Sequence, residues 1–324
     1  MLPWDMAIFI HESEHPLMRT MTHMSFHVWQ DRLFGPSGGW DNSHMNQKEA
    51  RISIQLEINA LMHAMKSIGD ERVNAIRDAL SIRAERRRVF PAAAARHENV
   101  FEFHEGIATY SDTILSEITM EEILADLRLR AEGIRYHPSL MGVFGYTTGA
   151  LYGHLLDTTD VNWREGIRYG VDLGQLLKDA IGITELTTFD EIDLSQYGYA
   201  DILAFETERV IAHERVVEDI RTAFANEAVM NIPTTMRNPG MNVSLASILI
   251  VPGLGQVFGA IVMFDGVFGR FEMHDGFYVP GRGFIATDMR QVGNRVYGPG
   301  WIIELNEGFE VYPTRGGNYT VRRK

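Results

Sequence analysis

The sequence of 324 residues contains no cysteine, and this absence removes several classes of chemistry. Disulfide bridges, thiolate metal sites and a cysteine nucleophile are all excluded. Because no cysteine is present, cysteine usage does not indicate the redox compartment either. A metal site in this chain therefore has to be built mainly from histidine and carboxylate side chains.

Positive charge and long apolar runs are also scarce. The chain has 30 lysines and arginines against 43 aspartates and glutamates, which argues against nucleic acid or an anionic membrane surface as the main partner. No apolar run approaches the roughly 20 residues that span a membrane. The start of the chain lacks the basic and apolar segments of a signal peptide. We expect a soluble protein, whose compartment and oligomeric state the composition does not identify.

The hydrophobic content of 45% is enough for a substantial core. Apolar periodicity and breaker residues predict an α+β fold, with a short strand at 4–10, a mostly helical domain over 1–228 and a small antiparallel β domain over 229–324. Helices are expected at about 16–34, 48–68, 70–88, 97–117, 119–131, 140–157, 161–181 and 199–226.

Two histidine pairs with a spacing of four lie close together near the N-terminus: HESEH at 11–15 and HMSFH at 23–27. Histidines four apart share a metal only if the backbone between them is helical. The first pair matches the HExxH pattern but precedes Pro16 directly, so we expect it to be a loop. The second lies in the middle of the expected helix 16–34. It is either a metal site or a pair packed in a helical interface.

The segment EGIATY, residues 105–110, supports the metal interpretation. HxxxH on one helix followed by EGxAxY on a later helix resembles the gluzincins, the zinc peptidases that include thermolysin-like enzymes and aminopeptidases. The resemblance implies a zincin-like helical domain with an N-terminal edge strand and a peptide or protein substrate. It also implies Zn²⁺ held by His23, His27 and Glu105.

The similarity extends along most of the chain. THMSFHVWQ, residues 22–30, resembles the HExFHxxQ helix of a group of uncharacterised bacterial gluzincin-like proteins. The segments at 50–61, 144–157 and 298–313 resemble later parts of the same group, in the same order.

The resemblance places Met24 where gluzincins have the glutamate that accepts a proton from the attacking water. A thioether is not basic, and loss of a general base costs about 10²- to 10⁴-fold in rate. We therefore expect an impaired metallopeptidase, or alternatively a non-catalytic pseudoenzyme that binds a peptide or protein in the former cleft. Recruitment of Glu12 or Glu14, artificial replacement of the base, and a chain cut from a longer parent remain open.

Three further residues are candidates for supporting roles. Glu57 lies on the apolar stripe of its helix, where a carboxylate needs a partner. It is expected to orient a ligand histidine, to be an alternative third ligand, or to pair with an arginine such as Arg51. Tyr110 and Tyr146 are candidates for stabilising an oxyanion, the alternative being ordinary packed aromatics.

Four other patterns are expected to be structural. The arginines at 83 and 86–88 should form a solvated face near a helix C-terminus. His104 is not expected to share a metal with Glu105, because neighbours on a helix diverge by about 100°. NEGF at 306–309 should be a hairpin turn, and PGLGQVFG at 252–259 should be a turn rather than a phosphate loop.

Overall fold

The structure is a computed structural model that describes residues 16–35, 38–238, 240–243, 248–259, 261–314 and 316–324. The expected strand 4–10, the HESEH pair, and Glu12 and Glu14 lie outside the described residues. The chain has an α+β fold with two compact units, Met1–Thr207 and Glu208–Lys324. The division lies inside helix α10, whereas the predicted boundary after residue 228 lies just beyond its end.

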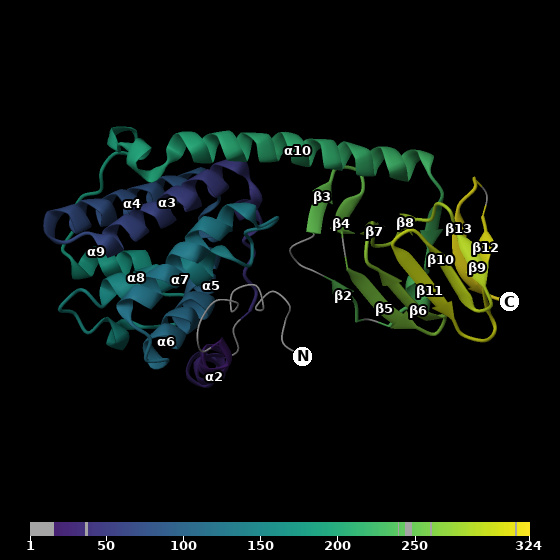
Figure 1. Cartoon of the computed structure of the whole chain (residues 1–324), viewed down its shortest axis with the longest axis horizontal. Coiled ribbons are helices and arrows are strands. Elements are labelled where there is room, and N and C mark those ends of the chain that lie inside the picture. The colour runs from purple at the N-terminus through teal and green to yellow at the C-terminus, as the bar shows by residue number, and fades with distance from the viewer. Residues whose placement is uncertain (1–15, 36–37, 239, 244–247, 260, 315) are drawn as a thin grey trace. The chain divides into compact units, whose positions relative to one another are not determined.

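The first unit is helical (Figure 1). Its elements, with short 3-10 or π turns labelled η, are α2 (Pro16–Phe34), η1 (Ser43–Asn46), α3 (Lys48–Lys66), α4 (Gly69–Val89), α5 (Ala92–Phe101), η2 (Glu102–Gly106), α6 (Ile107–Leu115), α7 (Met120–Gly133), η3 (Ile134–Tyr136), α8 (Phe144–Leu156), η4 (Trp163–Gly166), α9 (Leu173–Ala180), η5 (Phe189–Glu191), η6 (Leu194–Tyr197) and the beginning of α10 (Tyr199–Asn226), whose remainder belongs to the second unit. Helix α3 packs on α4, α7 and α8 at the centre of the hydrophobic core.

The predicted bounds of α2 and α10 match the structure, and two other predicted helices are interrupted. Helix α2 begins at Pro16 and ends before Gly35, whose φ of 81° is the left-handed geometry that suits a helix C-cap. The expected helix 97–117 is divided by η2, a single π-helical turn. In the expected helix 161–181 only α9 is α-helical.

The prediction of a solvated arginine face at the end of α4 is wrong for most of its members. Arg83 and Arg86 are 3% and 1% exposed, the Arg87 side chain is 15% exposed, and the Arg88 side chain is 72% exposed. Helix α4 presents this edge to α3 and α5, so the arginines pair with carboxylates instead of water. We call the buried group the arginine cluster: Arg83, Arg86, Arg87, Glu57, Glu98, Glu102 and Asp172.

Glu57 belongs to this arginine cluster. Its oxygens accept hydrogen bonds from Arg83, Arg86 and Tyr152, and none from a ligand histidine. The expected alternative, an ion pair, is therefore the observed role, but with different arginines. Arg51 pairs with Glu206 instead.

The second unit contains two β-sheets. The strands are β1 (Val229–Asn231), β2 (Asn242–Val243), β3 (Ile248–Val251), β4 (Gly255–Gly259), β5 (Val262–Gly266), β6 (Gly269–Met273), β7 (Phe277–Val279), β8 (Gly283–Ile285), β9 (Arg290–Val292), β10 (Arg295–Gly298), β11 (Trp301–Leu305), β12 (Phe309–Pro313) and β13 (Tyr319–Arg323). Within the described residues the sheet orders are β12-β13-β1-β8-β7-β4-β3 and β2-β5-β6-β11-β10-β9. Pairing is antiparallel except between β1 and β13.

Both turn predictions in this unit can be compared with the sheet topology. PGLGQVFG contains the turn between the antiparallel neighbours β3 and β4, and Leu254 donates its amide to Val251. NEGF is also a turn, with Gly308 at a φ of 83°. It is not a hairpin, however, because β11 and β12 belong to different sheets.

No helix in the described parts of either unit combines the length and the apolar character that a membrane crossing requires.

Candidate metal centre

Helix α2 is polar on its inner face and apolar on its outer face. Arg19, Thr20, His23 and Gln30 are buried, with 2–6% of each residue exposed. These groups can be buried because α6 and η2 supply partners for them. The outer face carries apolar residues that are 48–70% exposed: Leu17, Met18, Met21, Val28, Trp29 and Leu33. Met24, next to His23 at the border between the two faces, is 39% exposed.

The segment that carries Glu105 is held against α8 by direct backbone packing. A Cβ atom on Gly106 would lie 2.5 Å from both the carbonyl oxygen of Gly145 and the Cα of Gly149. Such distances are shorter than van der Waals contact, so only glycine fits at position 106 without a shift of the backbone. This packing explains the glycine of the EGxAxY motif, and it places the π turn where Glu105 can reach α2.

A second set of contacts, made by Glu102, fixes the same segment. The carboxylate of Glu102 accepts hydrogen bonds from both terminal nitrogens of Arg83, at 2.8 and 2.6 Å, and from Thr148 Oγ1 at 2.8 Å. The arginine cluster is therefore connected to the candidate metal centre through η2. Single π turns are rare and occur frequently at functional sites.

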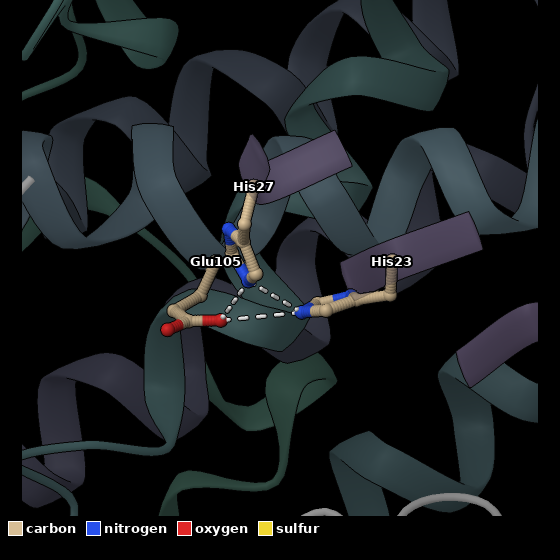
Figure 2. Close-up of side chains that lie close together, drawn as sticks. All are labelled: His23, His27 and Glu105. Carbon is tan, nitrogen blue, oxygen red and sulfur yellow. Dashed lines mark hydrogen bonds and ion pairs between the residues drawn. The ribbon is translucent and has the colours of Figure 1, made fainter. Parts of the chain in front are cut away.

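His23, His27 and Glu105 bring three ligand atoms together (Figure 2). The two Nε2 atoms are 2.9 Å apart, and each is 3.3 Å from Glu105 Oε2. Ligands bound to zinc at about 2.0–2.1 Å with tetrahedral angles are separated by about 3.3 Å. The two distances to Glu105 equal this spacing, and the distance between the two nitrogens is slightly shorter.

The outer nitrogens of both histidines face hydrogen-bond acceptors. His23 Nδ1 is 3.5 Å from Asp112 Oδ2, and His27 Nδ1 is 3.0 Å from Gln30 Oε1. A neutral imidazole has one N–H and one lone pair, so a proton on Nδ1 leaves the Nε2 lone pair facing the centre. Two such lone pairs and a carboxylate repel one another unless a proton or a metal cation lies among them. The donor set therefore fits a metal.

The electrostatics of the metal-free side chains agree with this geometry. Burial alone would lower the pKa of His23, but hydrogen bonds with Asp112 and Glu105 outweigh it, and the net pKa is raised. Burial would likewise raise the pKa of Glu105, but its contacts with His23 and His27 hold the pKa of this carboxyl well below its usual range. Both shifts favour a proton or another cation among these side chains.

His104 lies beside the centre without joining it. Its ring stacks on His27 with centroids 4.2 Å apart, and its Nε2 is 3.8 Å from Glu105 Oε1, too far for a hydrogen bond. Burial lowers the pKa of His104 and thereby favours its neutral form. The ring thus packs against His27.

The two tyrosine candidates have different surroundings. Tyr110 donates its hydroxyl to Asp157 and also contacts Arg164, and burial raises its pKa. With its hydroxyl engaged there, Tyr110 corresponds to the packed alternative. Tyr146 stacks on the ring of His23, with centroids 5.8 Å apart and planes inclined by 14°, so it lies at the metal centre.

Asp112 and Gln30 were missed by the sequence analysis as partners of the ligand histidines. Gln30 follows His27 by three residues, and Asp112 follows Glu105 by seven, so both lie on the ligand faces of their helices. That spacing was a usable signal. Asp112 was not identified because Glu105 lies in the π turn, which changes the angle between the two side chains from that in a regular α-helix.

Comparison with family models, with curated proteins and with solved structures gives no match for this chain. The assignment of a function therefore depends on the geometry of the centre and on the motifs in the sequence.

Proposed function

We propose that His23, His27 and Glu105 bind one Zn²⁺ ion, and that the first unit is a metallopeptidase-like protein with an impaired catalytic site. The convergence of three ligand atoms at distances of 2.9–3.3 Å carries this proposal. Two imidazole nitrogens and one carboxylate oxygen form a ligand set found in catalytic zinc sites, which leave a fourth position open for a substrate. Structural zinc sites almost always have four protein ligands.

Zinc bound there would act as a Lewis acid towards the carbonyl oxygen of a peptide bond. The chain's own residues would hold the ion and stack Tyr146 beside it. Met24, at the position after His23, contributes no base. Hydrolysis by the glutamate-assisted route should therefore be slow, by about 10²- to 10⁴-fold relative to a site that has the base.

A non-catalytic role is the second candidate, and the outer face of α2 favours it. Met21, Met24 and Val28 leave 59%, 39% and 54% of their surfaces exposed on the helix that bears the histidines. Flexible methionine side chains adapt to varied apolar partners. Such a surface could hold a peptide or a protein segment without cleaving it.

Metal analysis tests the proposed site directly. We expect one zinc per chain in the purified wild type after loading and dialysis, and none in His23→Ala. The control is His63→Ala, because His63 pairs with Glu71 on the surface and does not belong to the ligand group. Zinc that persists in His23→Ala, or a wild type that binds none, would rule the site out.

Restoring the base separates the two functional candidates. In zinc-loaded Met24→Glu we expect peptide-cleavage activity to rise by about 10²- to 10⁴-fold over the wild type. Met18→Glu adds the same charge to the same helix, further from the ligands, and should leave activity unchanged. If Met24→Glu binds zinc but does not gain activity, the non-catalytic function is favoured.

A further inference from the structure

Gln30 connects the two elements that supply the proposed metal ligands. It lies on α2 and is only 2% exposed. Its Oε1 is 3.0 Å from His27 Nδ1, and its Nε2 donates to the carbonyl oxygen of Phe103 at 2.9 Å. Phe103 lies in η2, two residues before Glu105. One amide thus contacts a ligand histidine and the backbone beside the ligand glutamate.

The hydrogen bond of Gln30 with Phe103 determines which atom of Gln30 faces His27, and thereby which atom is the donor in that second hydrogen bond. A backbone carbonyl only accepts hydrogen bonds, so the NH₂ group of Gln30 must face Phe103 and its oxygen must face His27. An amide oxygen also only accepts, so His27 must carry its proton on Nδ1. The lone pair of His27 is then on Nε2, the atom that lies 3.3 Å from Glu105 Oε2.

We propose that Gln30 is a positioning residue, which sets the tautomer of His27 and at the same time holds the π turn in the register that brings Glu105 to the histidines. This role depends on the proposed metal function. The positioning role can nevertheless be tested separately from zinc binding, because the tautomer of His27 and the contact of Gln30 with η2 exist in the metal-free protein. His23 has a different partner, Asp112, which lies beyond Glu105 on α6 and also accepts a hydrogen bond from Arg19.

The decisive variant is Gln30→Met, which keeps the length of the side chain and removes both hydrogen bonds. Outer-shell substitutions at metal sites typically cost about 10- to 100-fold in metal affinity. We expect zinc affinity, measured by competition with a chelator, to fall by that factor. The visible absorption spectrum of the Co²⁺-loaded protein should also change, because it reports the arrangement of the ligands.

A matched control exists in the same unit. Gln55 is also a glutamine, is 3% exposed, and donates both to the carbonyl oxygen of Arg51 and to Glu206 on a different face of the core. Gln55→Met should lower stability as much as Gln30→Met does. It should leave the zinc affinity and the Co²⁺ spectrum unchanged, so a purely structural effect is distinguished from positioning.

A measurement on the metal-free protein separates failure of this inference from failure of the metal site. Nitrogen-15 NMR of the histidine side chains at pH 8 should show the Nδ1–H tautomer for His27 in the wild type and a mixture in Gln30→Met. If Gln30→Met does not fold, Gln30→Glu keeps the acceptor for His27 but loses the donor to Phe103. It should retain the tautomer and alter the Co²⁺ spectrum.

Two outcomes would overturn the positioning role. One is wild-type zinc affinity and an unchanged Co²⁺ spectrum in the folded Gln30 variant, while His23→Ala still abolishes binding. The other is a wild-type His27 that carries its proton on Nε2. Wild-type protein that shows the Nδ1–H tautomer yet binds neither zinc nor cobalt would instead reject the metal function and the ligand-positioning role together.

Discussion

The arginine cluster and the candidate metal centre are two polar clusters of the first unit that differ in where their positive charge comes from. In the arginine cluster each carboxylate contacts at least one guanidinium group of the chain, as Glu102 does with Arg83 and Glu98 with Arg86. In the metal centre, among the described residues, no lysine or arginine forms an ion pair with Glu105. Its partners are histidines.

The difference shows how a buried carboxylate with basic neighbours can stabilise the fold in one cluster and form a candidate binding site in the other. A buried carboxylate that has a fixed guanidinium partner is compensated permanently, and it needs nothing from outside. Glu105 and the two histidine lone pairs are compensated only by a proton or an added cation. The two clusters are joined by η2, in which Glu102 contacts one cluster and Glu105 belongs to the other.

The largest expected effect is on the arginine cluster. Arg86→Met leaves Glu57 and Glu98 without one of their guanidinium partners, and breaking a buried ion pair from one side costs about 3–5 kcal/mol. Chemical denaturation should show this loss in free energy of unfolding with and without zinc. The control Arg88→Met removes an exposed pair with Glu85 and should change little. Equal stability of the two variants would contradict the distinction between the clusters.

His154 is a buried base that belongs to neither of the two clusters. We therefore expect it to remain neutral. It is 2% exposed, and burial lowers its pKa from 6.5 to about 4. The unfolded chain therefore binds more protons between these values, and stability should fall as the pH drops from about 6.5 to 4. The loss from this residue is at most about 3 kcal/mol.

The measurement for His154 is the free energy of unfolding as a function of pH. In His154→Gln the slope between pH 6.5 and 4 should be shallower than in the wild type, because one titrating group is absent. Thr113 contacts His154 but does not titrate, so Thr113→Val tests for a general packing defect. It should lower stability by a similar amount at every pH in this range.

The smallest expected effect concerns the partner of His23. Asp112→Asn removes the charge opposite His23 Nδ1 and weakens the contact with Arg19. Zinc affinity should fall by about 10- to 100-fold in a chelator competition. Asp126→Asn also loses an ion pair with Arg19 but does not touch His23, so its affinity should match that of the wild type. A loss of affinity in both variants would point to Arg19 rather than to Asp112.

Much of the helical unit could be predicted from local signals. Pro16 and Gly35 delimit α2, and the histidine spacing within it indicated two of the three proposed ligands. Glu105 was predicted from its motif. The burial of Arg83 and Arg86 could not be predicted, because a basic run at the end of a helix has the same pattern whether it faces water or the carboxylates of other helices.

The sequence by itself determined which side chains are available, and it determined that His23 and His27 share one face, because helical periodicity is a local property. Only the tertiary structure decided that Glu105 meets them. The π turn depends on the contact of Gly106 with α8 and on the anchoring of Glu102 by Arg83, and these partners are distant in the chain. The same long-range packing decided that Gln30, an ordinary polar residue in the sequence, lies between the histidine helix and the glutamate.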